Sequence, residues 1–187
     1  MDAFDTTAAG NAGEEAVRST LRALRGDTIS GFIRTKNLVY FGKNFQLDFL
    51  VLVPKLGILV LEVKKWKGTI KATSQEEWVQ ELDFTTNRFR NASLQVLRTA
   101  GLLMQILEKE RLNKWPIRPL VVFAHDSAKV LKANGHHSPQ TDIIRRTMLP
   151  DWIAENSLDE VFYQFTEQEF ESVKNAVVKY TSEYKAP

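Results

Sequence analysis

The sequence predicts an α/β domain in which helices flank a mixed β-sheet. Hydrophobic residues recur at helical spacing in two segments, residues 13–25 and 91–109. Short runs rich in Val, Leu and Phe lie between and after these segments, as expected of strands. The resulting order of helix, strands, helix, strand, loop, strand and helix is typical of a sheet that helices cover in layers.

Composition is that of a single globular domain. The 187 residues are 43% hydrophobic, which supplies enough apolar surface for a core. Cysteine is absent, which excludes disulfides, thiolate zinc sites and cysteine nucleophiles. The polar N-terminus is unlike a signal peptide, and the longest apolar stretch, Gly57 to Leu61, is too short to span a bilayer. We therefore expect a cytoplasmic protein with no membrane partner.

The first expected helix, residues 13–25, orients two neighbouring glutamates differently. Glu14 lies three residues before Val17 and seven before Leu21, so it shares their inward stripe. Glu15 is spaced in the same way from two arginines and belongs to the solvated face. Glu14 is therefore the acidic residue of this helix that we expect near the core.

Strands are expected to follow this helix. Residues 28–41 predict one or two strands, and Leu47–Val53 and Ile58–Trp66 predict an antiparallel hairpin. A three-residue loop at 54–56 would pair Val53 with Gly57 and, counting outward, would place Asp48 opposite Glu62 on one face. A two-residue turn would shift the register by one residue and separate the two carboxylates. Residues 66–70 predict a further short strand.

The remaining elements follow from caps and apolar runs. Residues 91–109 predict a helix with Asn91 as N-cap, and Thr166–Glu169 is a capping-box pattern that opens a last helix to about Tyr184. Residues 125–142 predict a long loop. The hydrophobic stripe that this middle helix should turn to the core is Val96, Leu97, Ala100, Leu103, Met104 and Leu107. Two further strands are expected at Pro119–Ala124 and Val161–Phe165.

Charged residues in the predicted hairpin could carry chemistry. Glu62 and Lys64 share a strand face, and Asp48 joins them if the hairpin register holds. Two adjacent carboxylates repel each other unless a cation compensates, and Mg²⁺ prefers such oxygen ligands. The alternative is an ordinary ion pair on a solvated sheet face, which would leave Asp48 exposed and distant from Glu62. Against it, the strands around these charges are apolar, and buried charges usually need a partner or a metal.

The ordered motifs resemble a known family. Asp48, a hairpin and then Glu62-Val63-Lys64 is similar to the signature of the PD-(D/E)xK nuclease superfamily. The finer pattern resembles its nuclease-related domain (NERD) family, and its further elements are Gly10-x-x-Gly13-Glu14, Gln46-x-Asp48, Gly57, Trp66, Gly68, Trp78 and Asn91-x-x-x-Gln95. One departure is Asn91-Ala92, where the family often has Asn-Pro. The resemblance implies a restriction-endonuclease-like fold with an α-β-β-β-α-β core. It implies one nuclease-related domain over residues 1–187, with its core at about 10–125 and a strand–helix extension at 158–184.

The resemblance also implies a role for each matched residue. Asp48 and Glu62 would ligate Mg²⁺ together with the backbone carbonyl of Val63, and Mn²⁺ could substitute. Lys64 would be the catalytic lysine, and Glu14 would help to place metal or water. Gln95 would border the site, although its position alone also fits an ordinary helix flank.

Three functions are compatible with these residues. The first is metal-dependent hydrolysis of nucleic acid, with DNA as the expected substrate. The second is a catalytically inactive module on the same fold that binds nucleic acid or protein, and the third is a structural domain with surface ion pairs. The net charge of +2 favours nucleic-acid binding only if basic residues gather on one face. A homodimer is compatible with the sequence, but no residue requires one.

Overall fold

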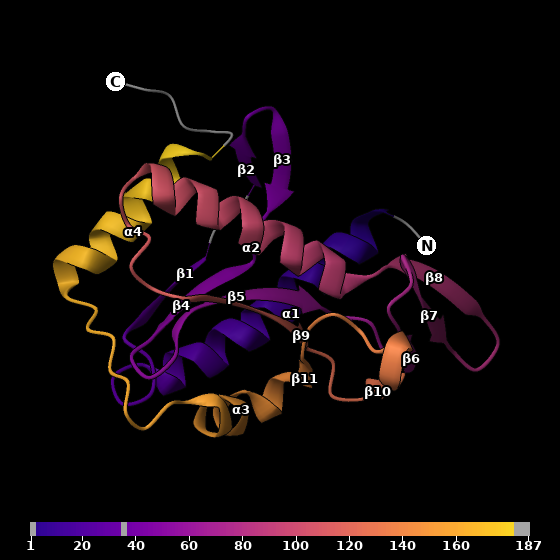
Figure 1. The fold of residues 1–187 in the computed structure, drawn as a ribbon. Coiled ribbons are helices and arrows are strands. Elements are labelled where there is room, and N and C mark those ends of the chain that lie inside the picture. Colours follow the sequence, from indigo (N-terminus) through magenta and orange to yellow (C-terminus); the bar gives the residue numbers. More distant parts are fainter. Residues whose placement is uncertain (1–2, 35–36, 182–187) are drawn as a thin grey trace.

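A five-stranded mixed sheet forms the centre of the protein (Figure 1). The computed structural model describes residues 3–34 and 37–181, with side chains from residue 12 onward. The strand order is β1 (Gly31–Arg34), β4 (Phe49–Val53), β5 (Gly57–Lys64), β9 (Ile117–Phe123) and β11 (Ile143–Arg145). Strand β4 runs antiparallel to both of its neighbours, β1 and β5, whereas β5, β9 and β11 run parallel.

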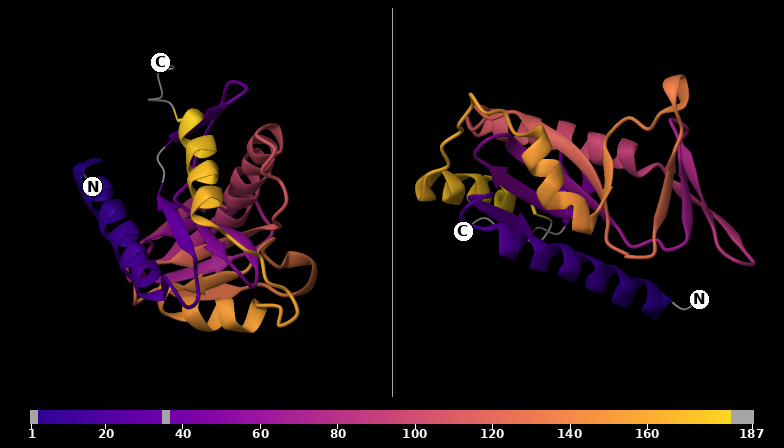
Figure 2. Two further views of the ribbon diagram at one scale, coloured as in Figure 1. Left: turned by 90° about the vertical axis from the view of Figure 1, so that its left-hand side faces the viewer. Right: turned by 90° about the horizontal axis from the view of Figure 1, so that it is seen from below.

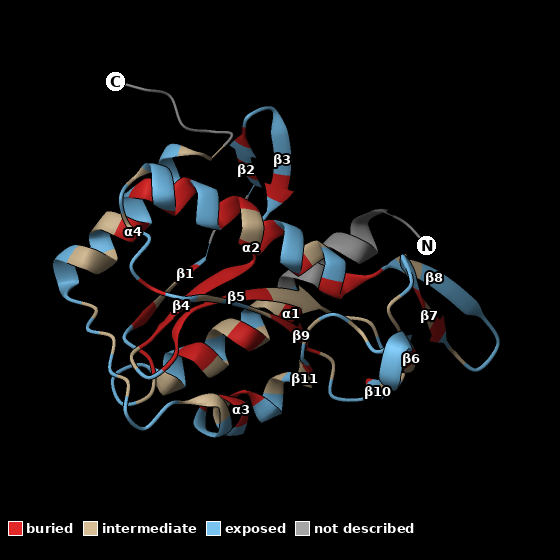
Figure 3. Cartoon of the chain, viewed as in Figure 1, coloured by how far each residue is buried: buried red, intermediate tan, exposed pale blue. Residues whose placement is uncertain are grey.

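Helices cover both faces of this sheet. Helices α2 (Ala92–Lys109) and α4 (Glu167–Lys179) lie on one face, and α1 (Ala3–Leu24) and α3 (Leu149–Asn156) lie on the other (Figures 1 and 2). The inward faces of the helices and the central strands are buried (Figure 3). Alternation along β5 divides the core, because Ile58 and Val60 pack under α2 whereas Leu59 and Leu61 pack against α1 and α3. The expected α-β-β-β-α-β core is thus confirmed as α1, β1, β4, β5, α2 and β9.

Smaller sheets extend from the ends of the central one. Strands β2 (Asn37–Tyr40) and β3 (Lys43–Gln46) form a hairpin before β4. Strands β6 (Thr69–Ala72), β7 (Glu77–Glu81), β8 (Thr86–Arg90) and β10 (Lys129–Lys132) form a four-stranded sheet beyond the end of β5. Two single-turn helices, Gly135–His137 and Arg146–Met148, complete the described elements.

The loop between β4 and β5 has three residues, the alternative that places Asp48 opposite Glu62. Val53 pairs with Gly57, so residues 54–56 form the loop and Asp48 comes opposite Glu62, just before the first residue of β4. Gly57 has a φ of 108°, and a Cβ atom built there would lie 2.5 Å from the carbonyl oxygen of Pro116. A glycine is therefore required both for the backbone conformation and for the close contact.

Gly57→Ala should lower the free energy of unfolding by on the order of 2 kcal/mol, because alanine would combine backbone strain with a steric clash. Urea denaturation of the two proteins would measure this difference. Gly101→Ala on α2 is the matched control, since a Cβ there meets nothing within 4 Å. Equal losses in both variants would contradict the steric explanation.

Several expected boundaries and elements were wrong. Helix α1 begins at Ala3 rather than residue 13, and residues 125–142 contain the strand β10 rather than one long loop. Residues 161–165 do not form a strand. Their hydrophobic side chains are used differently: the Phe165 ring packs 5.0 Å from the Trp115 ring, and the Tyr163 N–H donates to the Pro54 carbonyl. Tyr163 and Phe165 thus pack against the core although the segment pairs with no described strand.

The predicted N-terminal caps of α2 and α4 were confirmed. Asn91 caps α2 by accepting a hydrogen bond from the Leu94 N–H, and the capping box at Thr166 and Glu169 opens α4. In the expected stripe of α2, however, Leu97 and Met104 are 38% and 54% exposed, because they lie on the flank of the buried face. Helix α4 ends at Lys179, and the expected end at Tyr184 lies outside the described residues. Within the described residues, no helix is both long and apolar enough to cross a bilayer.

Candidate active site

Asp48 is held in place by two hydrogen bonds. The backbone N–H of Val63 donates to Asp48 Oδ2 at 2.7 Å, and the side-chain amide of Gln46 donates to Oδ1 at 3.0 Å. Only 5% of Asp48 is exposed. A surface ion pair would leave this residue accessible to solvent, so the structure contradicts that alternative.

Glu62 and Lys64 lie on β5, on the same face as Ile58 and Val60. Lys64 Nζ is 3.0 Å from Glu62 Oε1, and both side chains are largely buried. Lys64 Nζ also lies 5.3 Å from the centre of the Trp66 ring. An ammonium group held in this way keeps its position beside the two carboxylates.

The carboxylates share an environment that disfavours negative charge. Burial, followed by the neighbouring charge of Glu62, raises the pKa of Asp48 to about 7, although the hydrogen bond from Val63 opposes the change. Burial likewise raises the pKa of Glu62, with Lys64 acting in the opposite direction. Without a further cation, the pair is therefore electrostatically unsatisfied when both groups are ionised.

Glu14 approaches this cluster from α1. Its charge contributes to the raised pKa of both Asp48 and Glu62, and its carboxylate forms a 3.0 Å ion pair with Arg34 on β1. The preceding residue, Gly13, lets the helix come close to the end of β5, because an added Cβ would lie 3.1 Å from the Cβ of Lys65. Glu14 is half-buried as expected from its helical stripe.

Gln95 lies on α2, the helix that packs against β5. Its Oε1 atom is buried and has no hydrogen-bond partner among the described residues. One turn later on the same helix, the Thr99 hydroxyl donates to the backbone carbonyl of Gln46. The side-chain amide of Gln46 in turn donates to Asp48. A buried acceptor without a partner is unfavourable, so Gln95 Oε1 is suited to a ligand such as a metal-bound group or water.

These groups fit a magnesium ion. They are hard oxygen donors: two carboxylates at Asp48 and Glu62, and the free amide oxygen of Gln95 nearby. Among the described side chains, no three carboxylates or histidines are placed to hold a metal by themselves. Mg²⁺ commonly binds one or two carboxylates and fills its remaining positions with water and phosphate oxygens, so this small set suffices. The expected role of the Val63 carbonyl stays a prediction.

Two partners of the site were not predicted from the sequence. The first is Arg34, whose contact with Glu14 brings together residues 20 positions apart in the chain. The second is the Gln46 side chain, although alternation along an extended segment would have placed it on the same face as Asp48, two residues later.

Comparison with known families identifies the family of this domain. The family model for the nuclease-related domain matches residues 9–124, which include every residue of the cluster. Searches of curated proteins and of solved structures found no match. Since the matched segment covers more than half of the chain, the protein belongs to the nuclease-related domain family.

Proposed function

We propose that this protein is a metal-dependent nuclease that hydrolyses phosphodiester bonds of DNA. Mg²⁺ is the proposed cofactor, and Mn²⁺ can replace it. The observation that carries the proposal is the buried carboxylate pair, Asp48 and Glu62, with Lys64 held 3.0 Å from Glu62. A surface module that only binds a partner has no need for such a cluster, because its assembly is costly in the absence of metal.

Each residue of the cluster would have a distinct role in phosphodiester hydrolysis. Asp48, Glu62 and the carbonyl of Val63 would hold the ion, which supplies positive charge at a phosphoryl oxygen and makes water more acidic. Lys64 would stabilise the negative charge that builds on the phosphoryl group, with Glu62 fixing the position of its ammonium. Gln95 Oε1 would accept a hydrogen bond from the attacking water, and Glu14 would help to orient it.

A cleavage assay tests this proposal. Supercoiled plasmid and single-stranded DNA are incubated with the wild-type protein in Mg²⁺, in Mn²⁺ and in chelator. We expect cleavage only with metal, and we expect Asp48→Ala and Lys64→Ala each to lower the rate at least about 100-fold. Lys55→Ala, in the exposed loop between β4 and β5, is the control and should cut like the wild type.

Circular dichroism of each variant would show that the loss is not due to unfolding. Cutting that survives both substitutions would refute the assigned site. If the wild-type protein binds DNA but cuts none under any condition, the inactive binding module replaces the nuclease as the better description.

A further inference from the structure

Arg145 lies in register with Lys64, two strands away. Lys64 on β5 pairs with Phe123 on β9, and Phe123 pairs with Arg145 on β11. All three strands are parallel, so these residues form one row at the carboxyl-terminal edge of the sheet. Adjacent strands are about 4.8 Å apart, which puts the Cα atoms of Lys64 and Arg145 about 10 Å from each other.

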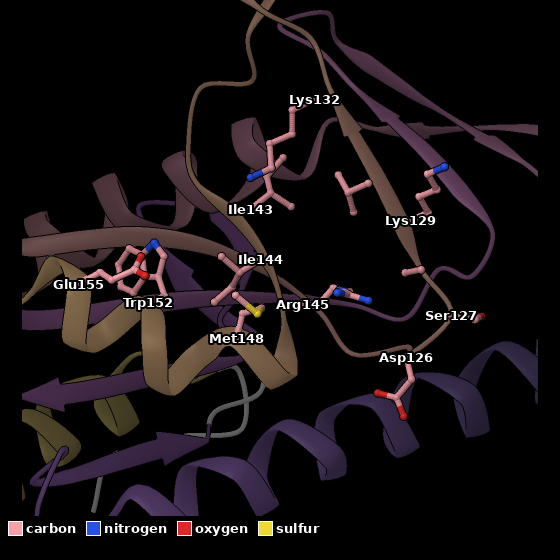
Figure 4. A pocket seen from close by; sticks show the side chains of 12 residues that line it. Asp126, Ser127, Lys129, Lys132, Ile143, Ile144, Arg145, Met148, Trp152 and Glu155 are labelled. Atoms are coloured by element: carbon pink, nitrogen blue, oxygen red, sulfur yellow. The ribbon is translucent and has the colours of Figure 1, made fainter.

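A cavity of about 620 Å³ opens beside this row (Figure 4). It lies between β10, β11 and α3, and its lining combines apolar and basic side chains. Ile144 and Met148 contribute to the apolar wall, and Arg145 and Lys132 extend into the space between the two strands. Ligand cavities in proteins commonly have this size, and a nucleotide would fit within it.

Basic residues around the cavity have no acidic partners. Lys129, Lys132 and Arg145 are exposed, and none forms an ion pair with a described residue. The two acidic lining residues do not balance them: Asp126 forms a 2.9 Å ion pair with Arg146, and Glu155 lies at the far end beside Trp152 (Figure 4). The open part of the cavity therefore favours a negatively charged ligand.

We propose that this cavity binds an unpaired nucleotide of the substrate strand, about three nucleotides from the bond that is cut. The inference rests on the proposed function, since it takes Lys64 as the position of the scissile phosphate. Arg145, Lys132 and Lys129 contact backbone phosphates, and the base packs against Ile144 and Met148. A separation of about 10 Å corresponds to about three nucleotides of a stacked strand at 3.4 Å each. The protein therefore acts on single-stranded or locally opened DNA.

Binding in the absence of cleavage tests this inference. A fluorescein-labelled single-stranded oligothymidylate is titrated with full-length protein in chelator, and its anisotropy is recorded at several salt concentrations. We expect Arg145→Ala and Lys132→Ala each to weaken binding about fivefold and to reduce the slope of log K against log salt by about 0.7, as the loss of one phosphate contact predicts. Lys55→Ala also removes an exposed positive charge, but at the opposite end of β5, and should have less than a twofold effect.

A second pair of variants tests the apolar wall. Met148→Glu places a carboxylate in the cavity and should weaken binding more than tenfold, whereas Met104→Glu changes an equally exposed methionine on α2 and should not. Both methionines are about half-exposed, so neither change should unfold the protein.

The outcomes separate the two proposals. The cavity inference would be overturned if three variants, Arg145→Ala, Lys132→Ala and Met148→Glu, bound the oligonucleotide as tightly as their controls. This holds even if the wild-type protein cuts DNA. Failure of the wild-type protein to bind the oligonucleotide would also overturn it. Binding that depends on Arg145 in a protein that cuts nothing would support the cavity and reject the nuclease.

Discussion

Mg²⁺ should bind this protein about 50-fold more weakly at pH 5 than at pH 7, because a ligand must lose its proton. Burial and the charge of Glu62 raise the pKa of Asp48 to about 7. Below that pH, Asp48 in the metal-free protein holds a proton that the ion has to displace, which lowers the apparent affinity about tenfold for each pH unit. Above pH 7 the carboxylate is already ionised, and the affinity should level off.

Isothermal titration calorimetry between pH 5 and pH 8 measures this dependence. Repeating the titration at pH 6 in two buffers of different ionisation enthalpy gives the number of protons released, which we expect to be close to one for each ion. An affinity that does not change between pH 5 and pH 7 would contradict the prediction that Asp48 binds the ion with a raised pKa. DNA cleavage at subsaturating Mg²⁺ should rise with pH over the same interval.

Asp48→Asn should raise the stability of the metal-free protein at pH 8 while it abolishes cleavage. The folded-state pKa of Asp48, about 7, is above the ordinary aspartate value of 3.8, so ionisation opposes folding. This effect is absent below about pH 4, grows as the pH rises towards 7, and is constant at higher pH. Asparagine has the shape of aspartate and can still accept the Val63 N–H, but it carries no charge. We expect a gain in the free energy of unfolding on the order of 2 kcal/mol at pH 8.

Urea denaturation at pH 8 and pH 4 measures the gain and its pH dependence. Asp83→Asn, an exposed aspartate in the loop between β7 and β8, is the control and should change little at either pH. Saturating Mg²⁺ should stabilise the wild-type protein more than Asp48→Asn. A variant that is less stable than the wild type at pH 8 would mean that the hydrogen bonds to the Asp48 carboxylate outweigh its burial.

The sequence predicted the centre of the site because local rules determine it. The length of the loop at 54–56 fixed the hairpin register, and alternation along β5 placed Glu62 and Lys64 on one face. Both rules depend only on residues that are near one another in the chain. The contact between Arg34 and Glu14 depends on how α1 packs against β1, which no local pattern determines.

The missed elements are short or lack an apolar pattern. Strands β10 and β11 contain four and three residues, which is too few for alternation to be recognised. The first ten residues of α1 have no stripe of large hydrophobic residues, so the sequence did not indicate that the helix begins at Ala3. The cavity beside β10 and β11 therefore could not be predicted from the sequence.

The three-residue loop between β4 and β5 tolerates substitution at its exposed position but is sensitive to changes in length. Lys55 is exposed at the loop, and its side chain can vary without disturbing the carboxylates. Insertion or deletion of one codon there would instead move Asp48 to the opposite side of the sheet from Glu62. Among related genes, a loop of altered length would thus identify copies in which the two proposed metal ligands no longer face each other, even where both are still encoded.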